Sequence, residues 1–189
     1  MLSASLSKVI NIVLYQVGWF SCLLGAAYGY PLSGALGAAA LVGLHLVLTD
    51  DRKAEIKLVF SACLLGVLVD SLQQATGLFT FKKDPSWPLW LPLWVFVIWG
   101  QFATLFRFAL HWLSGRYLLG ALFGALGGPL AYWGGIRLGA ASFGDSPLFT
   151  LFVLAIVWTG VIPLLLWIRQ KLASAEGSYR PISERYRDV

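Results

Sequence analysis

The chain has 189 residues, of which 58% are hydrophobic and 12% charged, and its mean hydropathy is +0.75. Soluble domains carry about 25% charged residues, so this composition excludes a soluble fold and predicts a membrane protein. The formal net charge is +5, but the basic residues lie beside hydrophobic segments, where anionic lipid head groups account for them, and we expect no nucleic-acid partner.

Six hydrophobic segments are long enough to cross a bilayer, because one crossing takes about 20 residues. The sequence therefore predicts an all-α fold, a bundle of six transmembrane helices within residues 1–170. The expected spans are residues 9–27, 32–48, 56–79, 89–111, 117–137 and 148–168. Residues 171–189 are polar and of mixed charge, which predicts a disordered cytoplasmic tail.

The first span carries Asn11 and Gln16 among apolar residues. A signal peptide has an apolar core of only about 7 to 15 residues, so we expect this longer segment to remain uncleaved. Small and polar residues recur along it at intervals of three or four positions. This spacing places them on one helical face, which we expect to pack on other helices.

The second span ends near His45, which is followed by the hydrophilic loop 49–53. His45 with Asp50 and Asp51 could be read as a set of metal ligands. A histidine near a helix end followed by a solvated turn is far commoner, so we expect neither a metal site nor a cofactor.

Asp70 lies well inside the third span, and Gln73 and Gln74 follow it at three and four positions, on the same helix face. A charged group inside a span costs at least about 2.5 to 3.5 kcal/mol on insertion scales and by default marks a functional site. The alternative is that Asp70 only hydrogen-bonds a neighbouring helix and holds the bundle together. We favour the functional reading.

The fourth span follows a tryptophan-rich loop that is typical of an interfacial aromatic belt, and it carries Gln101, Thr104 and Arg107. The fifth span is interrupted by Gly127-Gly128-Pro129. A proline removes one backbone donor and clashes with the carbonyl four residues earlier, which predicts a kink. Glycines at positions 120, 124 and 128 predict a groove along which another helix approaches closely.

Counting about 1.5 Å per residue from the flanking basic residues places several polar or helix-opening residues about 15 to 20 Å deep, in the middle of the bilayer. We therefore predict a polar site at the midplane. Its expected residues are Asp70, Gln73, Gln74, Gln101, Gly128, Pro129, Thr159 and Gln16. Secondary candidates are Asn11, His45, Arg107 and Arg137. An ion pair between Asp70 and Arg137 stays open, because the expected kink could lower Arg137 into the membrane.

The orientation follows from the distribution of Lys and Arg over a six-span chain. Only Lys82, Lys83 and Arg137, of the fourteen basic residues, fall on the side opposite the termini. Both termini are therefore expected to be cytoplasmic.

Several stretches of the chain together resemble an uncharacterised family of small bacterial inner-membrane proteins, a domain of unknown function. The resemblance rests on Asn11, residues 14–16 and 18–20, His45, Asp70, residues 93–94 and 102–105, and above all residues 124–132 (GALGGPLAY) with Gly135 and residues 137–140 (RLGA). It implies a multi-pass protein of the bacterial inner membrane. It also implies a lipid-related setting, because such proteins are often encoded beside cyclopropane-fatty-acid-synthase-like enzymes.

Three classes of function remain open. The first is a carrier or flippase-like protein that handles a lipid or small amphiphile at the midplane site. The second is a non-catalytic accessory or scaffold for lipid-modifying enzymes. A membrane-embedded enzyme comes last, because no nucleophile, base and orienting group can be assembled from these polar residues. Membrane lipids are the expected partners, and a homo-oligomer or a lipid-enzyme partner stays open.

Overall fold

The computed structural model describes residues 4–85 and 87–177, which form six α-helices and two short strands. The helices are α1 (Ala4–Ala27), α2 (Pro31–Leu48), α3 (Arg52–Ala75), α4 (Leu93–Ala103), α5 (Tyr117–Arg137) and α6 (Pro147–Gly177). The predicted all-α fold is confirmed. Within the described residues, α1, α2, α5 and α6 are long and apolar enough to cross a membrane, which indicates a membrane protein.

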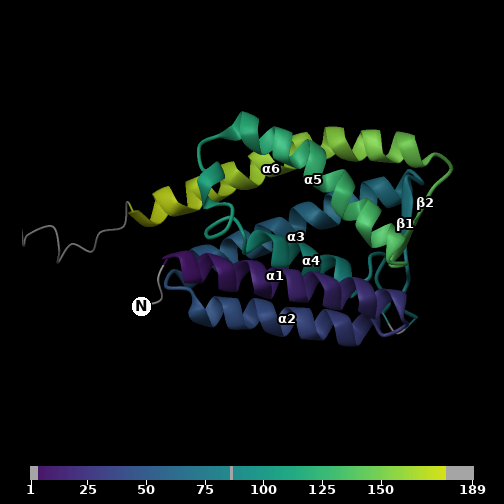
Figure 1. Ribbon diagram of the computed structural model, residues 1–189, viewed down its shortest axis with the longest axis horizontal. Helices are drawn as coiled ribbons and strands as arrows, with labels where there is room; N and C mark the ends of the chain where they lie inside the picture. Colours follow the sequence, from purple (N-terminus) through teal and green to yellow (C-terminus); the bar gives the residue numbers. More distant parts are fainter. Residues whose placement is uncertain (1–3, 86, 178–189) are drawn as a thin grey trace, which may run out of the picture.

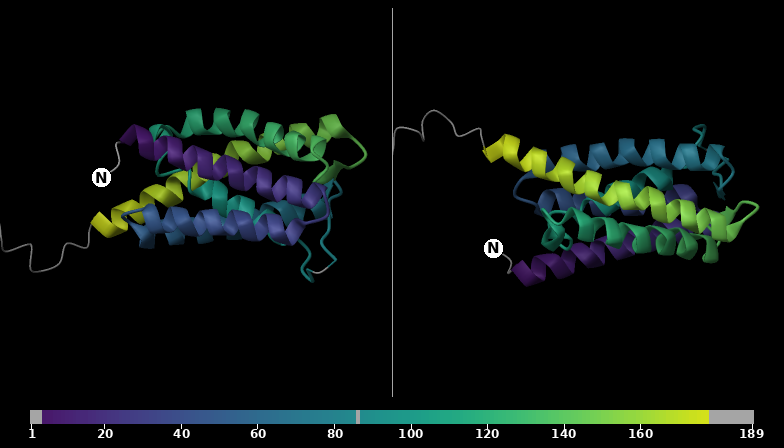
Figure 2. Two further views of the ribbon diagram at one scale, coloured as in Figure 1. Left: turned by 60° about the horizontal axis from the view of Figure 1, so that its bottom comes forward. Right: turned by 90° about the horizontal axis from the view of Figure 1, so that it is seen from above.

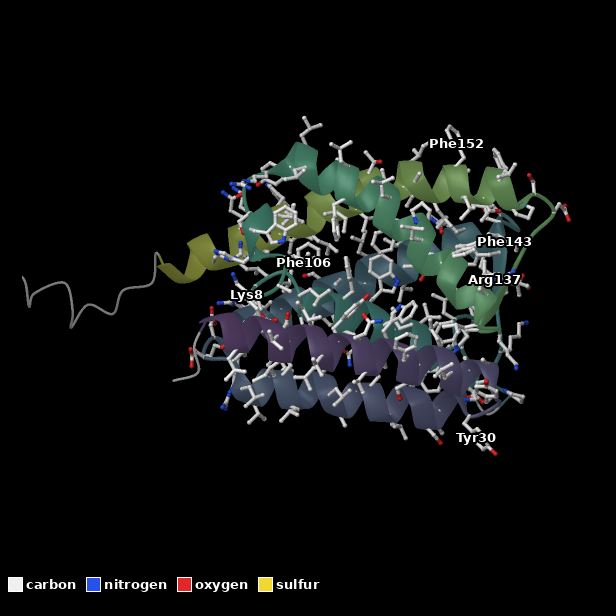
Figure 3. All side chains as sticks on the ribbon, in the orientation of Figure 1. Lys8, Tyr30, Phe106, Arg137, Phe143 and Phe152 are labelled. Atoms are coloured by element: carbon white, nitrogen blue, oxygen red, sulfur yellow. The ribbon has the colours of Figure 1, made fainter. Side chains whose placement is uncertain are left out.

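The six helices run back and forth along one direction, so that the start of α1 and the end of α6 lie at the same end of the bundle (Figure 1). We call this end the Lys8 end and the opposite one the Tyr30 end, after residues labelled in Figure 3. Helix α1 packs on α2, and α5 packs on α6. Helices α3 and α4 lie between these two pairs, as the further views in Figure 2 also show.

Close packing within the two pairs depends on glycine. A Cβ atom at Gly34 of α2 would overlap the carbonyl oxygen of Ser21 in α1. In α5, a Cβ atom at Gly124 would overlap the carbonyl oxygen of Trp158 in α6, and one at Gly128 would overlap the Trp158 side chain. The glycine groove predicted for the fifth span therefore faces α6. The helix continues through Pro129 without interruption.

The fourth helix is shorter than the predicted span 89–111, because α4 covers only Leu93–Ala103. Pro92 precedes it with an extended backbone (φ −61°, ψ 147°). At the other end, the Thr104 hydroxyl donates to the carbonyl of Gln101 at 2.7 Å. Such a bond competes with the helical ladder, and residues 104–110 wind as tight turns before a short 3-10 helix, η1 (His111–Leu113).

Two short strands were not expected. Helix α3 ends at Ala75, short of the expected residue 79, and Gly77 follows with φ +73°, a conformation that favours glycine. Strands β1 (Phe79–Phe81) and β2 (Ala141–Phe143) then pair in antiparallel fashion, with Phe79 opposite Phe143. This ribbon joins the α3–α4 and α5–α6 connections at the Tyr30 end (Figure 1).

Helix α6 extends to Gly177, beyond the expected end of the sixth span at residue 168. The first seven residues of the expected tail, 171–177, are therefore helical. Residues 178–189, the rest of that tail, lie outside the described residues.

Candidate functional site

A cavity of about 240 Å³ lies in the interior, bounded by residues of α1, α3, α4, α5 and α6. Its wall is formed mainly by aromatic side chains, among them Tyr15, Trp19, Trp94, Trp99, Tyr132 and Trp158. Of the residues that line it, Asp70 is the only carboxylate, and no Lys, Arg or His takes part. The site is therefore an apolar, aromatic cavity with one acidic group.

Asp70 of α3 is held by one residue from each of two other helices. Its Oδ2 atom accepts a hydrogen bond from the indole Nε1 of Trp99 in α4 at 2.8 Å, and its Oδ1 atom accepts one from the hydroxyl of Tyr132 in α5. The side chain is buried, with 1% of its residue surface exposed. Both carboxylate oxygens therefore have a neutral donor, and each donor also belongs to the cavity wall.

The local sequence explains how Trp99 reaches Asp70. Gly66 lies one helical turn before Asp70, and a Cβ atom there would overlap the Trp99 indole. The indole of Trp99 also stacks on that of Trp158 in α6, with ring centroids 5.2 Å apart and planes 18° apart. Gly66 thus leaves the space in which an aromatic pair brings an N–H group to the carboxylate.

Small residues of α5 form the opposite wall. Gly127, Ala131 and Gly135 line the cavity, and a Cβ atom at Gly127 would meet only Phe123, at 3.9 Å. Gly127 therefore borders open space, whereas its neighbour Gly128 also contacts Trp158. One face of α5 packs on α6 and the adjoining face borders the cavity.

Helix α1 closes the cavity at the Tyr30 end. There, Cβ atoms at Gly134 and Gly135 would lie 3.5 Å from Trp19 and 3.4 Å from Leu23, respectively. From this contact α5 slants away from α1 toward the Lys8 end (Figure 1). The residues lining the cavity on that side include Leu110 and Phe123, and the cavity is only partly enclosed.

A second polar cluster, formed by Asn11, Gln101 and Thr104, does not line the cavity. Gln101 Nε2 donates to the carbonyl of Ala38 at 2.7 Å. Asn11 Nδ2 donates to the carbonyl of Thr104 at 3.1 Å, while its Oδ1 accepts from the backbone N–H of Ala109 at 3.4 Å. Asn11 thus bonds two backbone groups of the irregular segment 104–110, and Gln101 joins α4 to α2.

The two glutamines after Asp70 also lie outside the cavity wall. Gln74 Oε1 accepts from the backbone N–H of Phe81 at 3.1 Å, which ties α3 to β1. Gln73 is buried, and neither of its amide atoms has a hydrogen-bond partner among the described residues.

The remaining candidates for the midplane site face other directions. Gln16 and Thr159 are exposed on the outside of the bundle, and the Thr159 hydroxyl donates to the carbonyl of Ala155. Arg137 is exposed at the Tyr30 end and lies over the ring of Trp133 (5.9 Å to the ring centroid; Figure 3). Within the described parts of the chain, no basic residue forms an ion pair with Asp70. Of the eight expected site residues, Asp70 and Gly128 line the cavity, whereas Pro129 does not.

His45 and Arg107 belong to an ionic cluster around the buried Glu55 at the Lys8 end. His45 Nε2 lies 2.8 Å from Glu55 Oε1, and Arg107 lies 3.4 Å from Glu55 and 2.8 Å from Asp51. Glu55, which was not among the expected site residues, is completely buried. Its position in the first turn of α3, where an acid is favourable, was the available signal. No group of three metal-ligating residues was found in the described chain.

Sequence reasoning also missed Trp99 and Tyr132, the two partners of Asp70. Tyr132 lies one turn after Gly128 in the GALGGPLAY stretch, and Gly66 lies one turn before Asp70. Both spacings indicate close helix contacts, but neither reveals which side chain fills the space.

Comparison with known proteins gives a family and no activity. Neither curated proteins nor solved structures contain a match to the chain. The family described as "Protein of unknown function (DUF2878)" matches residues 8–164, from the second turn of α1 into α6. The match covers most of the chain, including the whole cavity wall. The chain therefore belongs to this family of unknown function.

Proposed function

We propose that the protein is a carrier or flippase-like protein that binds a lipid or small amphiphile in the aromatic cavity, with Asp70 as the acidic group of the cavity wall. The observation that carries this proposal is the combination of an apolar interior cavity with one buried carboxylate in its wall. An apolar cavity with a few convergent polar groups is the usual form of a small-molecule site.

The size of the cavity limits what it can hold. Its volume of about 240 Å³ is below the roughly 300 to 1,000 Å³ of pockets that enclose a drug-sized ligand. A single hydrocarbon chain or ring fits such a volume better than a complete two-chain lipid. The rest of a larger ligand would extend toward the Lys8 end, where α1 and α5 diverge (Figure 1).

Asp70 supplies the polar chemistry. A carboxylate accepts hydrogen bonds from a hydroxyl or amine of a ligand, and a protonated carboxyl can donate one. The Tyr132 hydroxyl, now a donor to Asp70, can turn to a ligand oxygen instead. A proton or a polar ligand group can thus exchange at Asp70 while Trp99 still holds the other oxygen.

We further propose six passages through the bacterial inner membrane, with both termini in the cytoplasm. The shared position of the start of α1 and the end of α6 supports an even number of passages (Figure 1). Helix α4 has 11 residues and spans only about 16 Å, so the turns 104–110 and η1 would complete its passage. Reporter fusions after Asp51 and Gly115 should report cytoplasm, and fusions after Lys83 and Gly144 the outer side. A fusion after Gly115 that reports the outer side would contradict this topology.

The cavity is tested by filling it. Gly127→Leu places a side chain in open space beside the cavity, whereas Gly43→Leu makes the same change on an exposed part of α2 where no atom lies within 4 Å. With radiolabelled 1-dodecanol as the probe in a non-ionic detergent, Gly127→Leu should weaken binding at least about tenfold. Gly43→Leu should bind as the unmodified protein does. Equal affinity of the two variants, at equal folded yield, would remove the cavity as the binding site and leave the scaffold function as the alternative.

A further inference from the structure

We propose that the ligand is anionic, and that Lys8 and Arg169 bind its negatively charged head group at the Lys8 end while its hydrocarbon chain lies in the cavity. This inference rests on the proposed function, because it names the class of ligand that the same cavity takes. It concerns charges that lie outside the cavity wall itself.

Each of these two cations lies two helical turns beyond a residue of the cavity wall. Arg169 follows Ile162 of α6 by seven residues, and Lys8 precedes Tyr15 of α1 by seven residues. Residues seven apart share a helix face and are separated by about 10.5 Å along the axis. Both helices therefore carry a positive charge beyond the cavity on the face that lines it, at the end where α1 and α5 diverge (Figure 3 labels Lys8).

A third element brings His111 to the same place. His111 directly follows Leu110, which lines the cavity, and its Nδ1 atom lies 2.7 Å from Nη2 of Arg169. The charges of Arg169 and Lys8 both act on His111, so the two cations lie near the same ring. The His111 Nδ1 atom accepts a hydrogen bond from Arg169 and orients the guanidinium, which also donates to the Ser114 hydroxyl.

The two cations also lack carboxylate partners. In the described part of the chain, the acids of this region, Asp51 and Glu55, pair with Arg107 and His45, and neither Lys8 nor Arg169 forms an ion pair. The buried Nε atom of Arg169 makes no hydrogen bond to the described residues. The charges of Glu55 and Arg107 also act on Arg169, but its hydrogen bonds go to neutral groups. A half-buried guanidinium with a free donor is complementary to a phosphate or carboxylate.

An anionic amphiphile satisfies both ends of this arrangement. Its chain would meet the aromatic cavity wall, and its head group would lie about two turns away between α1 and α6. A neutral amphiphile would bind only in the cavity, and inorganic phosphate would bind only to the two cations. The structure therefore predicts that chain and charge must be joined in one molecule for full affinity.

The test compares three probes on the full chain in a non-ionic detergent: dodecyl phosphate, 1-dodecanol and inorganic phosphate. We expect dodecyl phosphate to bind at least about tenfold more tightly than dodecanol, and this preference to fall as salt is added. Arg169→Gln should remove most of that preference and leave the affinity for dodecanol unchanged. Arg116→Gln, which removes an exposed cation at the same end, should change neither affinity.

Lys8→Gln provides a second variant, because Lys8 is exposed and its loss cannot remove the contacts of Arg169 with Ser114 and His111. It should weaken dodecyl phosphate binding by a smaller factor than Arg169→Gln. Equal affinities for dodecyl phosphate and dodecanol would overturn the inference and leave the cavity proposal standing. Binding of neither amphiphile would overturn the proposed function itself. If inorganic phosphate binds as tightly as dodecyl phosphate, the ligand of the two cations is a free anion and not a lipid head group.

Discussion

The protein buries two polar clusters that look alike in the sequence and differ in their surroundings. Asn11, Gln101 and Thr104 bond mainly to backbone groups of neighbouring segments, away from the cavity. Among the described residues, Asp70 bonds to the side chains of Trp99 and Tyr132 alone, and all three line the cavity. A backbone partner cannot leave without unfolding the segment, whereas a tyrosine hydroxyl can turn to another acceptor. The Asn11–Gln101–Thr104 cluster therefore holds the bundle together, whereas the Asp70–Trp99–Tyr132 cluster can exchange a partner for a ligand.

The largest expected loss of stability follows from disrupting the cluster of Asn11, Gln101 and Thr104. Asn11→Leu leaves the carbonyl of Thr104 and the N–H of Ala109 without their side-chain partner. Each buried group left unpaired costs about 1 to 3 kcal/mol, so the unfolding temperature in detergent should fall by several degrees. Gln16→Leu removes an exposed amide from the same helix and should change the unfolding temperature little. Equal unfolding temperatures for the two variants would show that Asn11 does not stabilise the bundle.

Asp70 provides the sharpest contrast between stability and activity. Asp70→Leu leaves the Trp99 and Tyr132 donors unpaired and should lower both folded yield and activity. In Asp70→Asn, the amide oxygen can accept from Trp99 and the amide nitrogen can donate to the Tyr132 hydroxyl. This variant should fold nearly as well as the unmodified protein but lose activity in a complementation assay, because it cannot ionise. Full complementation by Asp70→Asn at matched expression would contradict a role for proton exchange at Asp70 and indicate that the carboxylate is purely structural.

A smaller effect is expected for one partner of Asp70. Tyr132→Phe removes a single hydrogen bond and leaves the Trp99 bond in place, so it should cost about 0.5 to 1.5 kcal/mol of stability. The measurement is chemical unfolding in detergent, with Tyr28→Phe, an exposed tyrosine, as the control. A loss as large as that of Asn11→Leu would show that the cavity cluster is structural as well.

Hydropathy alone predicted six helical segments, because an apolar run of about 20 residues leaves few alternatives to a helix in a bilayer. The glycine repeat of α5 likewise predicted a close helix contact, and the structure identifies α6 as the partner. The shortened α4 could not be predicted, since its end depends on the Thr104 hydroxyl and on Asn11, which lies 93 residues earlier in the chain.

For the candidate site, the depth of each residue in the membrane follows from its sequence position, whereas the direction in which it faces depends on how the helices pack. The rise per residue places Asp70, Gln101 and Thr159 about 15 to 20 Å from their flanking charges. Whether a residue at that height faces a cavity, another helix or the outside depends on which helices pack together and at what angle. Asp70 reaches the cavity, Gln101 meets α2, and Thr159 and Gln16 face outward, because the pairs α1–α2 and α5–α6 close tightly on glycine while α1 and α5 diverge.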